Sequence, residues 1–323
     1  MAGPNYDVTV IGGGIHGVGV AQAAAAAGYS VLLLEQHSLA SGTSSRSSKL
    51  IHGGLRYLEG AHLGLVRESL REREILLRIA PGLVQRVPFY IPVYVTTRRP
   101  PWMIRAGLSL YSLLGGLSSE TRFASVSRAR WQDLDGLTTQ GLRAVFRYED
   151  AQTDDARLTQ AVMRSAQSLG AELRCPANFL SAQRSTSGYE VHYLESHNAR
   201  ACHTRTLVNA AGPWVNPMLD RITPRPPRLA VDLIQGAHIV LEGATRQGVY
   251  YVEAPRDGRA VFVMPWKNQT LVGTTETYFN GDPQAAQALP EEIAYLEETL
   301  EHYFPRGRGR RVADVSEGPR GTL

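Results

Sequence analysis

A glycine-rich turn near the amino terminus constrains this chain more than any other feature. Residues 8–35 read V-T-V-I-G-G-G-I-H-G-V-G-V-A-Q-A-A-A-A-A-G-Y-S-V-L-L-L-E. This pattern predicts a strand, a tight turn, an alanine-rich helix and a second strand that ends in an acid. Gly12 lets the chain turn out of the strand, Gly14 lets a phosphate approach the backbone, and Gly17 lets the helix pack close to the sheet. The helix amino terminus then attracts an anion, so the pattern predicts a site for a dinucleotide pyrophosphate.

The acid at the end of the second strand supports this interpretation. Glu35 lies 18 residues after Gly17, a separation at which an acid accepts the hydroxyls of an adenosine ribose. A glycine motif by itself is weak evidence, but here the preceding strand, the following helix and the acid are all present. The alternative is a tight turn between strand and helix that holds no ligand.

Composition excludes several classes of protein. The chain has 323 residues, of which 43% are hydrophobic and 20% are charged, as in ordinary globular proteins of about two domains. A net charge of +4 is too small to argue for nucleic-acid binding. The amino terminus does not resemble a secretory signal, and no apolar run is long enough to span a membrane. Cys175 and Cys202 match no metal or redox spacing, so we expect two unpaired thiols and no metal site.

Periodicity along the chain predicts an α/β fold (α+β overall). We expect helices over 63–79, 101–117, 154–169 and 290–303, a proline-containing strand at a sheet edge or entry over 87–96, and a hairpin that turns at Gly188. From about residue 215 the pattern is rich in strands. We therefore expect a Rossmann-like nucleotide domain from residues 1–86 and 150–214, interleaved with a substrate domain of β-sheet and helix from 87–149 and 215–315. Residues 316–323 would begin a return to the first domain.

Residues 43–59 read T-S-S-R-S-S-K-L-I-H-G-G-L-R-Y-L-E. Together with the opening turn, this element resembles the FAD-dependent, quinone-linked glycerol-3-phosphate dehydrogenases of the D-amino-acid-oxidase-like flavoprotein superfamily. Matching stretches at 154–158 (D-D-A-R-L), 208–215 (V-N-A-A-G-P-W-V) and 263–266 (V-M-P-W) extend the resemblance along the chain. It implies oxidation of sn-glycerol 3-phosphate to dihydroxyacetone phosphate, with a hydride passing from C2 to FAD and the electrons passing on to a quinone.

Several residues of the matching segments are implied to contact FAD. Ser44, Ser45 and Ser48 can hydrogen-bond the ribityl chain and the pyrophosphate, although a polar loop with local turn bonds uses the same residue types. Gly53 and Gly54 would let the backbone lie against the flavin ring, or they form a plain turn. The resemblance further implies flavin contacts by Thr43, Leu50, Ala211, Gly212 and Trp214.

Two histidines are candidates for the hydroxyl proton of the substrate. An imidazole has an ordinary pKa of about 6.5 and suits general-base work, so His52 is either that base or a residue that positions the flavin. His238 follows a Gly-Ala step at the start of a strand in the second domain, from which it could reach the flavin face. A histidine at a strand start also commonly has a structural role.

The substrate phosphate calls for a cation. Arg56 is the first candidate, for the phosphate or for the developing alkoxide, because a guanidinium binds phosphate through paired donors. The alternative for Arg56 is a salt bridge to Glu59. Tyr57 either hydrogen-bonds the substrate or is an ordinary half-buried aromatic residue. Arg320 matches a phosphate-binding arginine of the family.

The sequence departs from the family pattern in two places. Gln235 stands where the family has a lysine, so one cation near the mouth of the site is replaced. The sequence ends at Leu323, where relatives continue through a strand and a G-G-K-x-T-T-Y-R helix start that faces the flavin. The chain therefore resembles a truncated enzyme, and we expect this polypeptide by itself to bind FAD weakly.

Other functions remain open at this stage. The chain could be a truncated, catalytically silent FAD-binding fragment, or an amine or amino-acid oxidase of the same superfamily. A nicotinamide-dependent dehydrogenase is disfavoured because the serine-rich segment would have no role in it. We expect a cytoplasmic chain, peripheral at the inner face of the plasma membrane through residues 102–117, although a plain interdomain helix fits that segment as well. A homodimer is compatible with the sequence.

Overall fold

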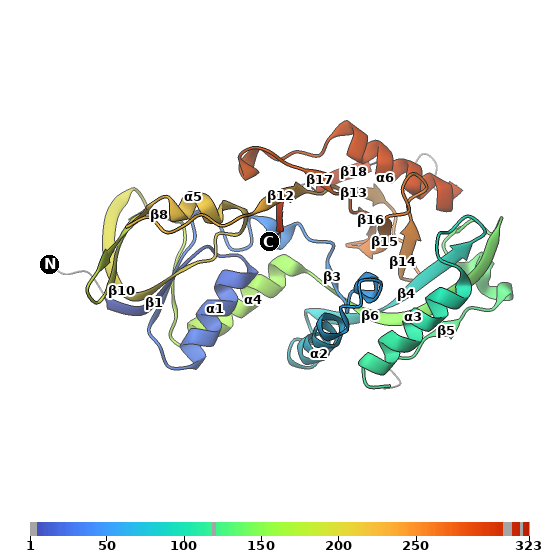
Figure 1. Ribbon diagram of the computed structural model, residues 1–323, viewed down its shortest axis with the longest axis horizontal. Coiled ribbons are helices and arrows are strands. Elements are labelled where there is room, and N and C mark those ends of the chain that lie inside the picture. Colours follow the sequence, from blue (N-terminus) through green and yellow to red (C-terminus); the bar gives the residue numbers. More distant parts are fainter. Residues whose placement is uncertain (1–4, 118–120, 306–311, 317–318, 323) are drawn as a thin grey trace.

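Two sheet-and-helix halves lie side by side along the long axis of the molecule (Figure 1). The computed structural model describes residues 5–117, 121–305, 312–316 and 319–322. One half contains the amino-terminal strand and a seven-stranded sheet, and the other contains a nine-stranded sheet. This division agrees with the predicted mixed α/β class.

The first half is built on the predicted glycine-turn unit. Its sheet has the strand order β11-β8-β9-β10-β1-β2-β7, and β1 pairs in parallel with both β2 and β10. Helices α1 (Ile15–Ala26) and α4 (Asp155–Ser168) lie side by side and pack on one face of the sheet. The strands are β1 (Asn5–Ile11), β2 (Val31–Leu34), β7 (Glu172–Arg174), β8 (Ala177–Ser185), β9 (Gly188–Glu195), β10 (Asn198–Asn209) and β11 (Ile222–Thr223).

The second half is a helix-covered mixed sheet, in which β14 and β4 pair in parallel and the other neighbours pair antiparallel. Its order is β18-β13-β16-β15-β14-β4-β6-β3, with β5 added beside β6. Helices α2 (Leu63–Ile79) and α3 (Pro101–Leu114) pack on one face, and α6 (Pro290–Tyr303) packs on the other. The strands are β3 (Leu50–Ile51), β4 (Val84–Tyr94), β5 (Ala124–Ser125), β6 (Leu142–Thr153), β13 (His238–Glu242), β14 (Val249–Glu253), β15 (Ala260–Trp266), β16 (Gln269–Gly273) and β18 (Val312–Ser316).

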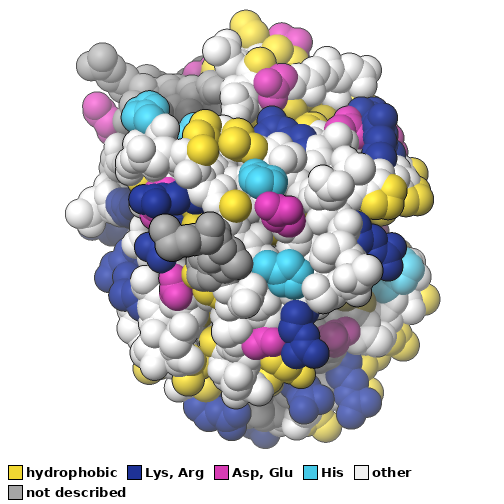
Figure 2. All heavy atoms as spheres, turned by 90° about the vertical axis from the view of Figure 1, so that its left-hand side faces the viewer, with side chains coloured by type: hydrophobic (Ala, Val, Ile, Leu, Met, Phe, Trp, Pro, Cys, Tyr) yellow, Lys and Arg dark blue, Asp and Glu magenta, His cyan; other side chains and the backbone are white. Residues whose placement is uncertain are grey.

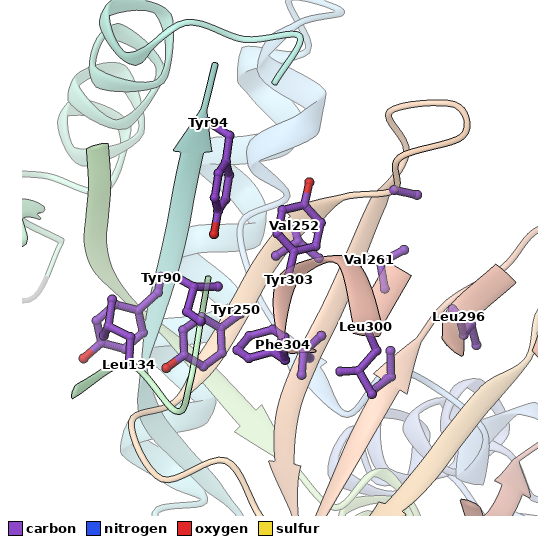
Figure 3. Close-up of a cluster of buried hydrophobic side chains, with 14 of the residues drawn as sticks. Tyr90, Tyr94, Leu134, Tyr250, Val252, Val261, Leu296, Leu300, Tyr303 and Phe304 are labelled. Atoms are coloured by element: carbon purple, nitrogen blue, oxygen red, sulfur yellow. The ribbon is translucent and has the colours of Figure 1, made fainter. Parts of the chain in front are cut away.

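Aromatic side chains fill the core beneath α6. Figure 3 shows Leu296, Leu300 and Tyr303 of this helix over the strands. The ring of Phe304 packs edge-on against Tyr250, with the ring centroids 5.1 Å apart. Burial of such large apolar surfaces is the main term that holds the helix on the sheet.

Short elements connect the halves. A small sheet has the order β17-β12-β19, in which Ile234 pairs with Arg320. Its strands are β12 (Asp232–Gln235), β17 (Thr277–Tyr278) and β19 (Pro319–Thr322). The remaining helices are α5 (Val215–Leu219) and the 3-10 turns η1 (Thr43–Ser45), η2 (Leu55–Leu58), η3 (Arg128–Asp133), η4 (Gly212–Trp214) and η5 (Pro283–Ala285).

Most predicted elements form where the sequence places them. Helices α2 and α6 have the predicted bounds, and Asp154 caps α4 by accepting the Arg157 N–H at 3.1 Å. Strand β4 differs, because it lies between β14 and β6 rather than at an edge. On the side that faces β14, only Phe89 and Tyr90 of β4 pair with the neighbouring strand. Most residues on that side therefore need no N–H donor, and prolines are tolerated there.

The division into domains at residues 86, 150, 214 and 315 stays a prediction. Hydrogen bonding joins β3 and all of β4 to the nine-stranded sheet, and α2 packs against that sheet. We therefore propose that the first crossover between the halves lies just before Leu50.

The mixed surface charges and the two free thiols agree with what the composition predicts. Figure 2 shows that basic side chains on the end formed by the first half are interspersed with acidic, histidine and hydrophobic side chains. Cys175 is exposed and Cys202 is buried, and both are free thiols. Within the described residues, no helix is both long and apolar enough to cross a bilayer.

Candidate active site

The glycine turn is shaped by contacts within the protein. Gly12 has a φ of +106°, and a Cβ added there would lie 2.6 Å from the carbonyl oxygen of Ala210 in the next segment of the sheet. A Cβ on Gly17 would lie 1.9 Å from the Gly12 oxygen, so α1 can approach the sheet this closely only with glycine. A Cβ on Gly14 would meet only the Ser44 hydroxyl, at 3.1 Å. The turn therefore leaves its Gly14 face open to a ligand.

Polar groups around this turn fit the ADP part of a dinucleotide. The Ile15 N–H at the start of α1 donates to Ser44 Oγ at 2.9 Å, so the serine segment lies against the helix amino terminus. The buried Glu35 carboxylate accepts N–H groups of Gly13 at 2.7 Å and His37 at 2.8 Å. These bonds fix the carboxylate beside the turn, and each oxygen keeps a lone pair for a ribose hydroxyl.

A buried ion pair anchors the serine-rich segment to α4. Lys49 Nζ lies 2.8 Å from Asp155 Oδ1 and also donates to the Ser45 carbonyl oxygen. The N–H and hydroxyl of Ser47 donate to Asp155 Oδ2 at 3.1 and 2.7 Å. Sequence reasoning assigned no role to Lys49 or Asp155. The available signal was that Lys49 is one of two lysines in a chain whose other basic residues are arginines.

The same segment reaches the nine-stranded sheet at His238. Ser48 Oγ lies 3.0 Å from His238 Nε2, and His238 is buried at the start of β13. Gly273 pairs with His238, and a Cβ there would lie 2.2 Å from the imidazole. On the next strand Phe262 pairs with Gly273, and its ring centroid is 6.0 Å from that of His52. The structure thus brings together both predicted histidines and Ser48.

The His52–Gly54 turn has its own internal bonds. The Gly54 N–H donates to His52 Nδ1 at 2.9 Å. Gly54 has a φ of +68°, and a Cβ there would collide with the Tyr57 ring at 2.3 Å. Burial lowers the pKa of His52, the nearby Asp150 carboxylate opposes this shift, and Arg73 adds to it. The imidazole is therefore neutral at physiological pH, and contact of Gly53 and Gly54 with a flavin stays a prediction.

Arg56 is available for a ligand. The expected alternative, a salt bridge to Glu59, does not form, because Arg99 occupies Glu59 and also pairs with Glu253. Arg56 is exposed and makes no hydrogen bond or ion pair with any residue in the described part of the chain. Tyr57, at 42% exposure, covers Gly54 beside it.

The other predicted flavin contacts lie near these groups. Ala211 N–H donates to Asn209 Oδ1 at 3.2 Å, Gly212 has a φ of +56°, and a Cβ on Gly42 would touch the Trp214 ring at 3.3 Å. The buried Trp214 Nε1 finds no acceptor among the residues that the structure describes. Ser45 Oγ donates to the Gly42 carbonyl oxygen at 3.2 Å, Thr43 begins η1, and Leu50 pairs with Gln152 in β3. The side chain of Arg320 lies outside the described residues.

Gln235 belongs to a buried network that the sequence did not reveal. Its Nε2 donates to Glu292 Oε2 at 2.9 Å, and Thr275 Oγ1 donates to Glu292 Oε1 at 2.7 Å. Thr275 Oγ1 also accepts the Ala237 N–H at 2.8 Å, next to His238. Burial alone would raise the pKa of Glu292, but these and neighbouring hydrogen bonds hold it below its ordinary value. Gln235 therefore donates a hydrogen bond to the Glu292 carboxylate, whereas a lysine at this position would neutralise its charge.

Comparison with known proteins decides the family. A family model described as FAD dependent oxidoreductase matches residues 7–322. The chain belongs to this family. The chain is 41% identical over 301 residues to a glycerol-3-phosphate dehydrogenase of Pseudomonas aeruginosa, a match that covers 93% of this chain and 58% of that protein. It is 36% identical over 308 residues to a D-erythritol 1-phosphate dehydrogenase of Brucella abortus, covering 94% of this chain and 61% of that one.

A solved structure has the same fold. The glycerol-3-phosphate dehydrogenase of Bacillus halodurans, complexed with FAD, matches with a TM-score of 0.79 at 24% identity, covering 98% of this chain and 57% of that one. The chain therefore has the predicted Rossmann-like flavoprotein fold. The family match and the curated relatives confirm the family resemblance and the FAD cofactor. The chain spans about three fifths of the length of the curated relatives it matches.

Proposed function

We propose that this chain supplies the FAD- and substrate-binding part of an enzyme that oxidises sn-glycerol 3-phosphate to dihydroxyacetone phosphate. The name of the Pseudomonas relative and the geometry of the site support this proposal. When bound, FAD would supply the hydride acceptor for the conversion of the C2 alcohol into a carbonyl. The chain must hold the phosphate, orient C2 and accept the hydroxyl proton.

The unpaired guanidinium of Arg56 is the observation that carries the proposal. A cation that already has a carboxylate partner would have to lose it before binding phosphate. Arg99 takes the carboxylates of Glu59 and Glu253, which leaves Arg56 as a fork of donors for a dianion.

The two histidines have different surroundings. His238 Nε2 faces the Ser48 hydroxyl, whereas His52 Nδ1 already accepts a backbone N–H. Because its Nδ1 already accepts this bond, His52 is the weaker candidate for accepting the C2 hydroxyl proton. Roles for Tyr57 as a substrate donor and for Arg320 as a second phosphate ligand remain predictions.

D-erythritol 1-phosphate is a second candidate substrate. The Brucella relative carries that name, and its substrate presents the same combination of phosphate and secondary alcohol. The two substrates differ at the end away from the phosphate. Arg56 would serve both, so a direct comparison of substrates is needed.

Dye reduction tests the proposal. The FAD-loaded chain is assayed with glycerol 3-phosphate, D-erythritol 1-phosphate, glycine, sarcosine and D-alanine. We expect a polyol phosphate to be oxidised and Arg56→Ala to lower kcat/KM roughly 10- to 100-fold, because a hydrogen bond to a charged group is lost. Arg98→Ala, which changes the local charge equally, should change it less than threefold. Preference for an amine, or flavin bound without turnover of any substrate, would contradict the proposal.

We further propose peripheral attachment to the cytoplasmic face of a membrane, where a quinone accepts the electrons. The support is a row of exposed apolar side chains on α3, with Trp102 at 69% and Leu113 at 57% exposure. Such a face suits the interface of a bilayer. In liposome flotation, Trp102→Glu and Leu113→Glu should each reduce binding, and equal flotation of all three proteins would contradict membrane attachment. Sedimentation of the loaded chain would test the homodimer.

A further inference from the structure

A buried polar network lies beneath the His52–Gly54 turn. It consists of Arg73 of α2, Tyr111 of α3 and Asp150 of β6, which are 0%, 1% and 1% exposed. Arg73 Nη1 lies 2.5 Å from Asp150 Oδ1, and the Tyr111 hydroxyl donates to Asp150 Oδ2 at 2.7 Å. Because burying such groups costs free energy unless each finds a partner, their placement here calls for an explanation beyond packing.

The network ends on the backbone of the turn. The Gly53 N–H donates to the Tyr111 hydroxyl oxygen at 2.7 Å. A Cβ on Gly53 would lie 2.7 Å from that same oxygen and from Leu70, so only glycine allows this approach. The orientation of the turn is therefore fixed by a side chain 58 residues further along the chain.

The turn in turn fixes the tautomer of His52. In a neutral imidazole one nitrogen carries the proton and the other accepts. His52 Nδ1 accepts the Gly54 N–H at 2.9 Å, which assigns the proton to Nε2. The ionisable groups around this ring are Asp150, which favours its charged form, and Arg73, which disfavours it.

We propose that Tyr111 and Asp150 are positioning residues that hold the Gly53–Gly54 turn, so that His52 presents a neutral Nε2–H donor to the redox site. His52 is then a hydrogen-bond donor and not the acceptor of the substrate proton. The assignment of the tautomer stands on the geometry of this chain, and only the direction of the donor toward the reaction rests on the proposed function.

Nitrogen-15 NMR of the histidine side chains tests the proposal in the FAD-loaded chain. The signals of His52 are identified by their loss in His52→Gln. We expect the unaltered chain to show the Nε2–H tautomer. Tyr111→Phe removes one hydroxyl and leaves the Gly53 N–H without its partner, so the ratio of tautomers should change about five- to tenfold. Asp150→Asn should change it in the same direction.

Tyr148→Phe is the matched control. Tyr148 is buried on the same strand as Asp150, and its ring packs edge-on against Tyr111, but its hydroxyl makes no hydrogen bond within the described residues. This variant should keep the His52 signals of the unaltered chain. In turnover, Tyr111→Phe should lower kcat about tenfold with KM changed less than twofold, as expected for a positioning residue.

Four outcomes are decisive. Unchanged His52 signals in Tyr111→Phe, or an equal change in Tyr148→Phe, would overturn the proposal. An Nδ1–H tautomer in the unaltered chain would do the same. A shift of the tautomer ratio in a chain that oxidises no polyol phosphate would support the positioning role of Tyr111 while refuting the proposed function.

Discussion

The two glycine turns of this protein are built in opposite ways. The turn at Gly12–Gly17 is shaped by its own strand, its own helix and the adjoining strand β10. The turn at His52–Gly54 is shaped by Tyr111 and Leu70, which come from helices that follow it in the chain. The first turn therefore depends on the absence of side chains, and the second on the presence of distant ones.

The two turns are therefore destabilised by different kinds of substitution. A turn made of backbone fails when one carbon atom is added to it. A turn supported by a buried charged network fails when a remote partner is removed, because the remaining charge stays buried without compensation. The following substitutions test this contrast.

The largest effect is expected at the first turn. Gly17→Ala places a Cβ 1.9 Å from the Gly12 oxygen, so α1 must move off the sheet. We expect a loss of about 5 kcal/mol in the free energy of unfolding and no retention of FAD. Gly19→Ala is the control in the same helix, because nothing lies within 4 Å of its Cβ, and it should stabilise by about 0.5 to 1 kcal/mol. Urea unfolding measures the stability of both variants. Similar free energies of unfolding would show that the first turn does not depend on the absence of a side chain at Gly17.

The second turn should respond to the loss of a remote charge. Arg73→Met leaves the Asp150 carboxylate buried without its cation, and we expect a loss of about 3 to 4 kcal/mol. The double variant Arg73→Met with Asp150→Leu removes both charges and should recover more than half of that loss. Urea unfolding of the single and double variants checks this. A single variant that loses less than about 1 kcal/mol would show that the ion pair is not what supports the turn.

A smaller effect is expected between the turns, where Lys49 anchors the serine-rich segment. Lys49→Met removes a buried ion pair with Asp155, but Asp155 keeps both hydrogen bonds from Ser47. We expect a loss of about 1 to 3 kcal/mol. Lys267→Met is the control, because the Lys267 side chain is largely exposed and its ion pair with Asp154 should contribute less than about 0.5 kcal/mol. Thermal unfolding measures both variants. Equal losses of stability would show that the Lys49–Asp155 ion pair stabilises the fold no more than the Lys267–Asp154 pair does.

The smallest effect concerns the network beside His238. The pKa of Glu292 is held below its ordinary value of 4.5 in the folded chain, so the unfolded chain binds the proton more readily. Its contribution to stability is therefore complete above about pH 4.5 and is lost as the pH falls through the folded pKa. The stability of Glu292→Gln should therefore depend less on pH over this range than that of the unaltered chain. Parallel pH curves of the two proteins would contradict this role.

Much of the fold was predictable because its signals are local. The bounds of α2 and α6 follow from apolar spacing, and the Asp154 cap follows from one residue type at one position. The interior position of β4 was not predictable, since its prolines indicate an edge and its short pairing with β14 joins residues 160 positions apart, Phe89 with Val249 and Tyr90 with Tyr250.

The sequence by itself determined the glycine turn, the family and the FAD cofactor. It did so because a glycine motif, a serine-rich segment and an acid at a fixed spacing each act within one stretch of chain. Only the tertiary structure decided which partners the residues around the site have. It paired Arg99 with Glu59, which left Arg56 free, and placed Tyr111 under Gly53. Such pairings depend on which distant side chains pack together, and a local sequence pattern cannot predict them.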